Sequence, residues 1–511
     1  MKTFELTGDN LDLELIDLIS SQKSAYKLTL SKQAQARLIQ SNEYVSSIVK
    51  SGKTVYGINT GFGALADTRI KDEELSELQY NLIRSHCTGV GEPFSKQVTR
   101  AIMLIRANCL LQGYSGVTPH AVNLLIDFLN HDIIPVVPSK GSVGASGDLA
   151  PLSHIALSLI GEGEVTYQGK VLPTDYVLKQ LDLKPAVLGP KDGLALINGT
   201  AVMAALYSVA LNQSLKLIKM ADIIGAMTLD GVAGTSRAFD PRIHQLKPHV
   251  GQVSVAKNLL RLLDQSQILN SHTDCRKVQD PYSLRCMPQV HGAIRQTVRH
   301  SLEVLNTELN SVTDNPLLFI EENDVISGGN FHGEALALGM DYLAMGIAEL
   351  CNITERRIEK LINPLFSDLP AFLVTKPGLN SGFMIAHVTA AALTSENKYL
   401  CHPASVDSIP TSTDKEDHVS MGVTSGNKLL VVLENTKNCL AIELLCACQA
   451  LDFRKPSNSS PVLNDVHKLV RNHVTTMERD RVISKDIKRI VELIDNSEIL
   501  DLVEKKIGAL E

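Results

Sequence analysis

The sequence predicts a mainly helical protein whose long helices pack as a bundle. After Asn198 most segments read as helices of roughly 20–30 residues, enough for a bundle of four or five, and strand signals are few. Hydrophobic residues make up 44% of the chain and charged residues 21%, as in a soluble globular protein with a large core. We expect residues 1–200 to form an N-terminal domain, and residues 201–511 to form the central bundle and a C-terminal helical region.

The N-terminal elements are predicted from short local patterns. Residues 3–6 read as a strand, and Asn10 is placed to cap a helix, because leucines and isoleucines then recur at helical spacing through residue 19. A second helix is expected over residues 31–49, and helical structure again over 97–130. A Gln-Gly pair between two runs rich in strand formers predicts a small hairpin over residues 164–172.

The rest of the chain is expected to consist mainly of long helices. One runs from about residue 199 to about 227, one ends near residue 363, and one spans roughly 379–399. Two prolines bracket residues 402–410, which are therefore expected to be extended. From residue 427 onward the chain reads as helical, with a sequence that suggests packing and assembly rather than chemistry.

Composition and charge exclude several classes of protein. The net charge is −7 without a long basic run, which argues against nucleic acid and anionic membranes as partners. The acidic N-terminus does not fit a secretory signal peptide, and no stretch reaches the roughly 18 uninterrupted apolar residues of a transmembrane helix. Nine irregularly spaced cysteines indicate reduced thiols in a cytoplasmic protein. Fifteen histidines without a His-Glu-x-x-His pattern give little support to a metal site, and none is expected.

A glycine-rich stretch at residues 141–152 is the feature around which the rest of the chain is organised. Glycines and serines alternate there with small residues, and apolar segments flank the stretch on both sides. It lacks the Gly-Lys-Ser/Thr of a phosphate-binding loop, the G-x-G-x-x-G of a dinucleotide fingerprint and the Gly-x-Ser-x-Gly of a nucleophile elbow. A plain glycine-rich turn is one interpretation.

A second interpretation is an electrophile built from the backbone. In Ala145-Ser146-Gly147 the small residues let the glycine amide nitrogen approach the alanine carbonyl carbon. Loss of water would close a five-membered ring, and loss of the Ser146 hydroxyl would leave an exocyclic C=C bond. Because no ordinary side chain is an electrophile, an enzyme that needs one must import a cofactor or make one.

These residues carry a resemblance to a known family. Ala-Ser-Gly-Asp at 145–148, between Gly-Ser-Val-Gly and Leu-Ala-Pro-Leu, resembles the signature of the aromatic amino-acid ammonia-lyases. That family forms 4-methylidene-imidazole-5-one (MIO) autocatalytically from Ala-Ser-Gly. The match covers about residues 55–422 at six places and is nearest to the histidine-specific branch. It implies the helical fold of the aspartase/fumarase-like lyase superfamily with little β structure, no external cofactor, and a homotetramer whose active sites draw residues from three subunits.

The resemblance also implies an activity. It is the non-oxidative elimination of ammonia from L-histidine to give trans-urocanate, the first step of histidine degradation. Within the family the alternative is a tyrosine or phenylalanine ammonia-lyase or an aminomutase. A non-catalytic helical scaffold is a further alternative, but it predicts decay of Tyr56, Ser146 or Arg285, and all three are present.

Catalytic roles follow from the resemblance. Tyr56, in Tyr-Gly-Ile-Asn-Thr-Gly-Phe-Gly, matches the catalytic tyrosine and would take the β-proton. Because tyrosine titrates at about 10, it needs a nearby positive charge or strong hydrogen-bond donors to act as a base near neutral pH. The expected catalytic set is Tyr56, Ala145, Ser146, Gly147, Tyr282 and Glu416.

Substrate contacts follow in the same way. His86, in Ser-His-x-x-Gly-Val-Gly, would contact the substrate ring, and the planar guanidinium of Arg285 would bind the substrate carboxylate. The carboxylate of Glu416 suits an imidazole and suits a benzene ring poorly. Asn198 would cap a helix, hold the ring oxygen or the amino group, or do both. The expected substrate-binding residues are His86, Asn198, Gln279, Arg285 and Phe331.

Three points stay open. Either the amine or the imidazole of the substrate would add to the methylidene carbon, and the amine route is favoured. Glu416 would contact the ring or handle the amine's proton. Lys415 stands where many relatives have a glutamine, and its effect on the local field is undetermined. His332 is expected to serve its loop rather than the chemistry.

Overall fold

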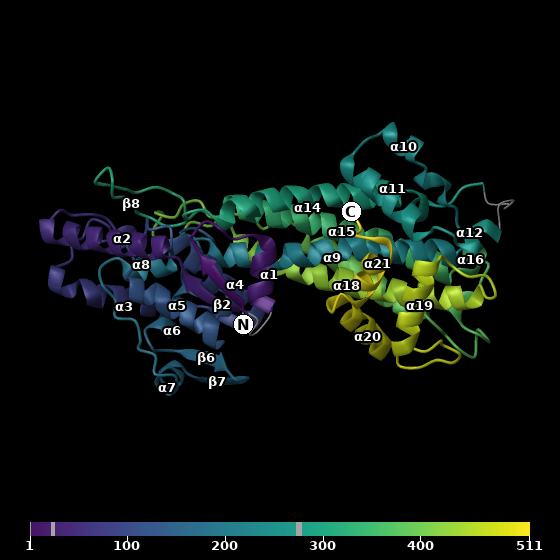
Figure 1. Ribbon diagram of the computed structural model, residues 1–511, viewed down its shortest axis with the longest axis horizontal. Helices are drawn as coiled ribbons and strands as arrows, with labels where there is room; N and C mark the ends of the chain where they lie inside the picture. Colours follow the sequence, from purple (N-terminus) through teal and green to yellow (C-terminus); the bar gives the residue numbers. More distant parts are fainter. Residues whose placement is uncertain (1, 22–25, 272–277) are drawn as a thin grey trace. The chain divides into compact units, whose positions relative to one another are not determined.

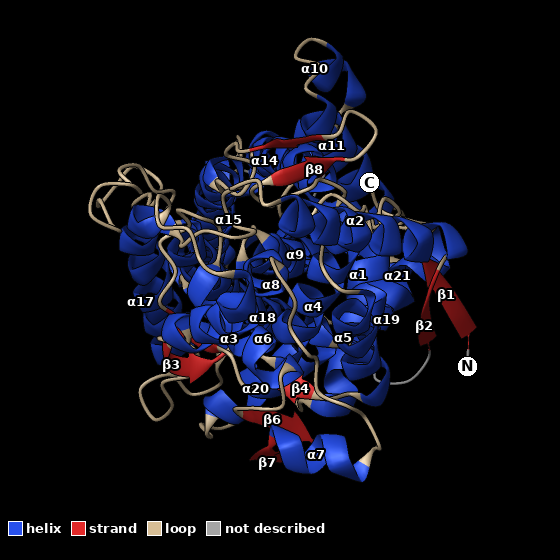
Figure 2. Ribbon diagram, turned by 90° about the vertical axis from the view of Figure 1, so that its left-hand side faces the viewer, coloured by secondary structure: helices blue, strands red, loops and turns tan. Residues whose placement is uncertain are grey.

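Helices dominate the computed structural model of the protein, which describes residues 2–21, 26–271 and 278–511 (Figure 1). The strands are a few short pieces (Figure 2), so the mainly helical class predicted from the sequence is confirmed. Cys275 lies outside the described residues, and the eight cysteines within them are all free thiols.

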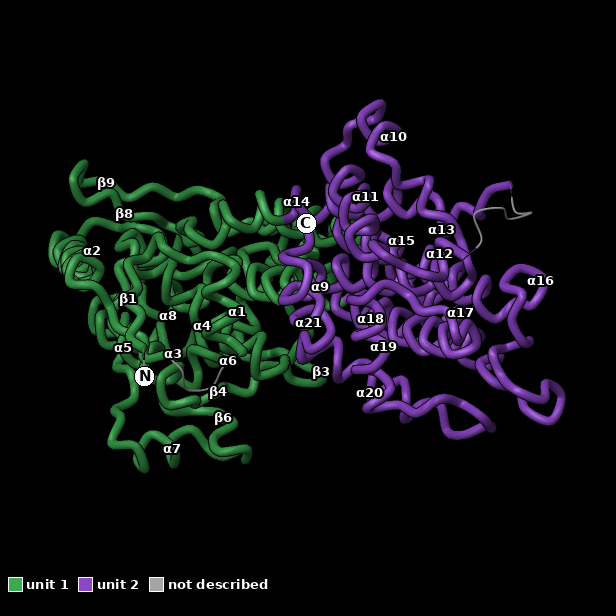
Figure 3. Tube along the Cα trace, turned by 45° about the vertical axis from the view of Figure 1, so that its right-hand side comes forward, with its two compact units in different colours: residues 1–212, 302–341, 403–427 green, residues 213–301, 342–402, 428–511 purple. Residues whose placement is uncertain are grey.

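The chain forms two compact units, neither of which is continuous in sequence. Unit 1 comprises residues 1–212, 302–341 and 403–427, and unit 2 comprises residues 213–301, 342–402 and 428–511 (Figure 3). The compact units interleave along the chain, so they do not bear on a division into functional domains. The division predicted at residue 200 therefore stays a prediction.

Unit 1 holds all the strands and the shorter N-terminal helices. Its elements are β1 (Lys2–Leu6), α1 (Leu13–Ser21), β2 (Tyr26–Leu30), α2 (Lys32–Ser51), α3 (Leu75–His86), β3 (Val90–Pro93), α4 (Lys96–Leu110), α5 (Pro119–His131), β4 (Ile134–Pro135), β5 (Pro138–Lys140), α6 (Leu149–Leu159), β6 (Glu164–Tyr167), β7 (Lys170–Pro173), α7 (Thr174–Gln180), α8 (Asp192–Ile197), β8 (Leu317–Phe319) and β9 (Asp324–Ile326). Strands β1 and β2 pair in parallel, and β4, β6 and β7 form an antiparallel sheet.

The remaining helices lie wholly or partly in unit 2. Four long helices have residues in both units: α9 (Ala201–Gly231), α14 (Met287–Leu309), α15 (Glu334–Ile362) and α18 (Gly422–Phe453). The others are α10 (Pro241–Gln245), α11 (Val250–Leu262), α12 (Gln267–Ser271), α13 (Tyr282–Arg285), α16 (Pro364–Ser367), α17 (Met384–Leu400), α19 (Pro461–His473), α20 (Ile483–Asp495) and α21 (Glu498–Ile507).

The first predicted helix begins two residues later than expected, and its cap is a different residue. Asp12 accepts a hydrogen bond from the Leu15 amide at 2.7 Å. Asn10 is instead tied to the preceding strand, since its side-chain nitrogen donates to the Glu5 carbonyl at 3.0 Å. The prediction of an Asn10 cap is therefore wrong, and α1 starts at Leu13 because the aspartate closes its first turn.

Other local predictions are confirmed or refined. Ser31 caps α2 by accepting from the Ala34 amide. The helical stretch expected over 97–130 is two helices, α4 and α5. The predicted hairpin is β6–β7, extended by β4. The β8–β9 hairpin, in the loop before α15, was not predicted.

The unit 2 parts of the four long helices enclose a buried polar network. His291 on α14 donates from Nδ1 to Asp222 on α9 at 2.8 Å, and its Nε2 accepts from Arg357 on α15 at 3.2 Å. Arg357 also donates to Glu443 on α18 at 2.6 Å. These four side chains have 0% exposure. Because each charge has partners on a neighbouring helix, the network favours one register of the bundle.

Two of these helices, α9 and α15, are long and apolar enough to cross a membrane by length and composition alone. In the most apolar 18-residue stretch of each helix, 78% of the residues of α9 and 67% of those of α15 are buried inside the protein. Core helices of a bundle have the same property, so the two helices are weak indications of a membrane span.

Candidate active site

One pocket in unit 1, with a volume of about 870 Å³, collects most of the residues predicted to form the site. They come from stretches far apart in the sequence, on loops and helix ends around the glycine-rich stretch. The predicted site residues that line it are Tyr56, His86, Ala145, Ser146, Asn198, Phe331 and Glu416. A smaller neighbouring pocket of about 290 Å³ shares His86, Ser146 and Glu416 and adds Gly147.

The glycine-rich loop adopts a backbone that requires glycine at two positions. Gly144 has φ 67° and Gly147 has φ 71°, both in the left-handed region. Gly147 also forms a bridge with Gly199, and the Asp148 amide donates to the Gly199 carbonyl at 2.8 Å. A side chain at Gly147 would collide with that carbonyl. The loop is therefore pressed against residues 198–200.

A second segment holds the loop from another side. The Met421 amide donates to the Val143 carbonyl at 2.8 Å, and the Ser420 hydroxyl donates to the Gly144 carbonyl at 3.1 Å. Ala145 packs with Val419 and Met421 in a small buried cluster. Contacts from both sides restrict the loop to one conformation.

Asp148 fixes the end of the loop to α9. Its carboxylate accepts from the amides of Val202 and Met203 at 2.9 and 3.0 Å, and from the Ser142 hydroxyl at 3.2 Å. Burial raises the pKa of Asp148 to about 7, although the two amides and the hydroxyl act in the opposite direction. The first amides of α9 thus find their acceptor on a residue 54 positions earlier in the chain.

Replacing Asp148 by alanine is expected to lower the free energy of unfolding by about 1–3 kcal/mol, because two buried amides lose their acceptor. Urea denaturation measures this change. The control is Asp175→Ala, which removes an exposed aspartate paired with Lys179 and should have little effect. Equal destabilisation by the two substitutions would contradict the anchoring role of Asp148.

Asn198 contacts the loop directly. Its side-chain nitrogen donates to the Ser146 carbonyl at 3.0 Å. It follows the last residue of α8 and does not cap α9, whose first amides bind Asp148. Of the roles considered from the sequence, the contact with the oxygen of residue 146 is present, and the side-chain oxygen of Asn198 has no hydrogen-bond partner among the described residues, so it does not cap α9.

Glu416 reaches the loop from 270 residues away. The Ser146 hydroxyl donates to Glu416 Oε1, while Thr411 and Ser412 donate to Oε2 at 2.8 and 2.6 Å. Burial acts to raise the pKa of Glu416, but these hydroxyl donors and the nearby His86 outweigh burial and lower it. Glu416 is therefore an anion held beside the β-carbon of residue 146.

His86, at the end of α3, has one ring nitrogen committed to the backbone. Nδ1 lies 2.8 Å from the Leu82 carbonyl, which can only accept, so Nδ1 carries the proton. Burial lowers the pKa of His86 despite the Leu82 carbonyl and Glu416, which act to raise it. The neutral ring therefore keeps a lone pair on Nε2, and His86 lines both pockets as a hydrogen-bond acceptor.

Tyr56 lies in the loop that precedes the short helix η1 (Gly63–Leu65). Burial raises the pKa of Tyr56, a hydrogen bond with the Gly63 backbone lowers it, and the carboxylates of Glu416 and Asp314 raise it further. The charges that act on Tyr56 in this part of the chain are thus anionic. The positive charge that a tyrosine base needs is not among the described groups found to shift it.

Residues 11–472 match the aromatic amino acid lyase family. The chain belongs to this family. Its predicted membership and its reaction class, that of a carbon–nitrogen lyase, are confirmed. So is the helical lyase fold, since solved members of the family cover the whole chain.

Several relatives of this lyase are named histidine ammonia-lyase. The protein from Natranaerobius thermophilus is 49% identical over 99% of both chains. The protein from Homo sapiens is also 49% identical, over 95% of this chain and 75% of its own. The crystal structure of histidine ammonia-lyase from Trypanosoma cruzi has a TM-score of 0.92 at 42% identity, covering 100% of this chain and 96% of that one.

The fold alone does not select the reaction within the family. A tyrosine aminomutase from Streptomyces globisporus has a TM-score of 0.94 at 34% identity, with 100% of both chains covered. The choice of substrate therefore depends on the side chains in the pocket.

Three predicted site residues of this lyase lie in unit 2 and do not line the unit 1 pocket. Gln279 is exposed, and the Tyr282 side chain is 70% exposed at the start of α13. Arg285 donates from Nε to the Asp280 carbonyl at 2.9 Å, with its guanidinium 4.5 Å from the Tyr282 ring centre. The roles assigned to all the site residues stay predictions.

Some residues around the pocket were not predicted from the sequence. The hydroxyls of Thr411 and Ser412 donate hydrogen bonds to the Glu416 carboxylate. No sequence motif marks hydroxyl groups that position another side chain in this way. Leu194 and Ile197 line the pocket from α8 and look like ordinary core residues in the sequence. Lys415, singled out for its departure from the relatives, also lines the pocket.

Proposed function

We propose that this lyase eliminates ammonia from L-histidine to give trans-urocanate, the first step of histidine degradation. The observation that carries this proposal is the meeting of Ser146, Glu416 and His86 in one pocket that also contains Tyr56. The names of the relatives that are about 49% identical over most of this chain support the same substrate.

The proposal includes an MIO group formed from Ala145, Ser146 and Gly147, with no external cofactor. The residues fit such a ring: Gly147 has the left-handed backbone and no room for a side chain, and Asn198 donates to the carbonyl of residue 146. The group would supply an electrophilic carbon at the former Ser146 β-position. Asn198 would then hold the ring oxygen, and Asp148 would hold the loop against α9.

Tyr56 would remove the β-proton of the substrate. Because the pKa of Tyr56 is raised, its phenol stays protonated in the substrate-free protein. A cation must therefore approach and lower this pKa before Tyr56 can act as a base. The ammonium group of the substrate itself is one such cation. A guanidinium from a neighbouring subunit is another.

His86 and Glu416 would recognise the imidazole. Neutral His86 offers a lone pair on Nε2, and anionic Glu416 offers carboxylate oxygens, so both are hydrogen-bond acceptors. A neutral imidazole carries one N–H donor and an imidazolium carries two, whereas a benzene ring has none. A site built to bind such donors rejects an analogue that lacks them, because its polar groups then stay unpaired. The second role of Glu416, transfer of the amine's proton, is compatible with its place beside residue 146.

Arg285 would bind the substrate carboxylate, with Gln279 and Tyr282 in support. We propose that these residues act in a cytoplasmic homotetramer whose active sites are shared between subunits. The resemblance to the family supports this part of the proposal.

An ultraviolet assay of the purified protein tests the proposed function, because each elimination product is conjugated and absorbs. Histidine should give trans-urocanate, and tyrosine and phenylalanine should give little product. Preferred turnover of tyrosine or phenylalanine would overturn the proposed substrate. Formation of a β-amino acid would identify an aminomutase instead.

The Glu416→Gln substitution is expected to reduce kcat/KM for histidine about 10–100-fold, because a charge-assisted hydrogen bond contributes about 1.5–3 kcal/mol. Residual turnover of phenylalanine should change much less. Asp417→Asn is the matched control, since its side chain lines the same pocket next in sequence. Equal losses in kcat/KM for histidine and phenylalanine would exclude a role of Glu416 in recognising the ring. Proton transfer would then be its remaining role.

A further inference from the structure

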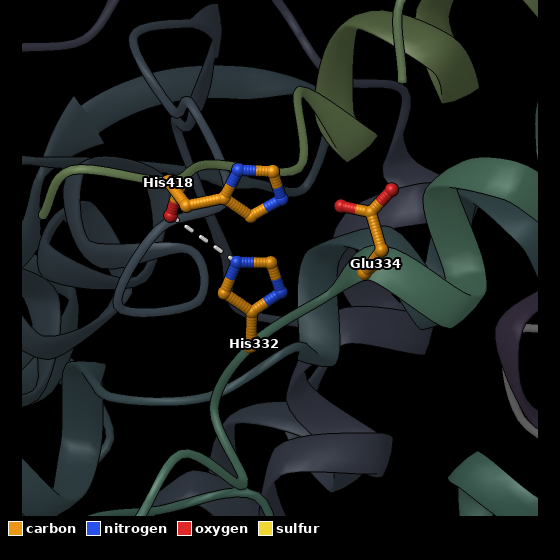
Figure 4. Close-up of side chains that lie close together, drawn as sticks. All are labelled: His332, Glu334 and His418. Atoms are coloured by element: carbon orange, nitrogen blue, oxygen red, sulfur yellow. Dashed lines mark hydrogen bonds between the residues drawn. The ribbon is translucent and has the colours of Figure 1, made fainter. Parts of the chain in front are cut away.

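Three side chains that the proposed reaction does not use converge at the edge of the active-site pocket. They are His332, Glu334 and His418, and one donor atom from each lies within 4.8 Å of the others (Figure 4). His332 and Glu334 stand where the loop from β9 enters α15, and His418 stands in the loop before α18. His332 and His418 also line the pocket.

The hydrogen bonding of His332 leaves one ring nitrogen ready to bind a cation. Nε2 lies 3.2 Å from the His418 carbonyl (Figure 4). A carbonyl only accepts, so Nε2 carries the proton and Nδ1 keeps its lone pair. Histidines that bind metals are typically oriented in this way, with the other ring N–H donated to a carbonyl or a carboxylate.

The arrangement of the His332 and His418 rings also favours the binding of a cation. They stack with centroids 5.7 Å apart and an interplanar angle of 7°. Figure 4 shows the Glu334 carboxylate beside the stacked pair, on the side to which each ring turns one nitrogen. One nitrogen of each imidazole and the carboxylate thus gather on the same side of the stacked pair.

The carboxylate of Glu334 gives independent support for a bound cation. Its Oε2 atom is buried and has no hydrogen-bond partner among the described residues. A buried carboxylate oxygen without a donor is costly, and a bound cation would compensate it. The sequence pattern could not reveal this group, because His332 and Glu334 are two residues apart and His418 follows 84 residues later.

We propose that His332, Glu334 and His418 bind one divalent transition-metal cation, with Zn²⁺ as the best match to two imidazoles and a carboxylate. Tetrahedral zinc with bonds of about 2.0–2.1 Å needs ligand atoms about 3.3 Å apart, so the donors must approach each other by up to about 1.5 Å. His418 is exposed and lies in the loop before α18, so its side chain has room to rotate toward the other two. Three protein ligands leave a fourth position open to water or a ligand.

The cation would join two segments that matter to the pocket. His418 lies two residues after Glu416, and the Thr411–Glu416 bridge closes the same loop. A cation held by His418 and by the start of α15 therefore fixes the loop that carries Glu416. This effect on turnover rests on the proposed function, whereas binding of the cation does not.

Cobalt titration of the chelator-treated full-length protein tests the binding site. One Co²⁺ per chain should bind with visible absorption typical of tetrahedral coordination, and without the near-ultraviolet charge-transfer band that thiolate ligands produce. His418→Ala and Glu334→Gln should each weaken binding at least about 100-fold, since loss of an outer-shell partner alone costs about 10–100-fold. His131→Ala, which removes an exposed histidine of α5, should bind as the wild type does. Unchanged binding in His418→Ala or Glu334→Gln would overturn the proposed site.

Turnover measured with and without chelator tests the regulatory part. The turnover of the wild type should change when the chelator removes the cation, and the turnover of His418→Ala should not change. The same response in both proteins would overturn the link to Glu416. Because Co²⁺ absorption is read without substrate, failure of the site and failure of the proposed reaction are distinguishable.

Discussion

Replacing Ser146 by alanine is expected to lower the turnover of L-histidine by at least about 10³-fold, a loss of about 4 kcal/mol or more in transition-state stabilisation. The reason is that alanine has no hydroxyl to lose, so the exocyclic double bond cannot form at residue 146. The β-proton of the substrate is far from acidic and its amine leaves poorly. Without an electron acceptor, the remaining groups can only position the substrate.

The matched control for this substitution is Ser153→Ala. Ser153 is buried one turn into α6, where its hydroxyl donates to the Leu149 carbonyl of the same helix at 2.7 Å. It should keep turnover close to the wild-type value. Denaturation curves of both variants establish that each is folded. Wild-type-like turnover in Ser146→Ala would refute the mechanism.

Replacing Tyr56 by phenylalanine is expected to lower kcat by about 10²–10⁴-fold, the usual contribution of a general base. The ring stays in place, so substrate binding should change little and the loss should appear mainly in kcat. Tyr44→Phe is the control, because burial and Asp324 also raise the pKa of Tyr44, yet Tyr44 is not among the residues that line the pocket.

The pH dependence gives a second test of Tyr56. A base works in its deprotonated form, and burial raises the pKa of Tyr56 above its ordinary value of 10.0. The phenolate fraction, and with it kcat/KM, should therefore rise with pH across the alkaline range. The Tyr56→Phe profile should lack this rise apart from the part due to the substrate amine. Identical profiles for the two proteins would exclude Tyr56 as the base.

Much of the pocket could be predicted because its parts carry strong local signals. The glycines at 144 and 147 mark a backbone that other residues rarely adopt, and the structure gives both a positive φ. The Tyr56 loop and the Ser-His stretch at His86 are likewise contiguous motifs. What the sequence could not supply is the contact between Ser146 and Glu416, since no local rule relates residues 270 positions apart.

The wrong prediction of an Asn10 cap and the unobserved capping alternative for Asn198 have a common cause. Asn10 and Asn198 both precede helices and both have the right side chain for a cap. In the structure Asp12 caps α1, and α9 is capped by Asp148 from across the fold. A cap supplied through tertiary contact leaves no trace next to the helix that it serves.

The residues in unit 2 illustrate a different limit. Arg285 was assigned to the substrate carboxylate from its motif, yet the pocket in unit 1 is lined without it. A motif specifies which residue acts, but the chain that supplies it to a given pocket depends on assembly. The group formed by His332, Glu334 and His418 has no motif at all, because one of its members comes from a distant loop.

The most direct test of the account is the mass of the peptide that contains residues 145–147, measured on protein that is active with L-histidine. If Ala145, Ser146 and Gly147 form the electrophile, the peptide should be lighter than its sequence by two water molecules. Ser146→Ala should not show the loss of the second water. An unmodified peptide in fully active protein would contradict the central claim that the chain makes its own electrophile.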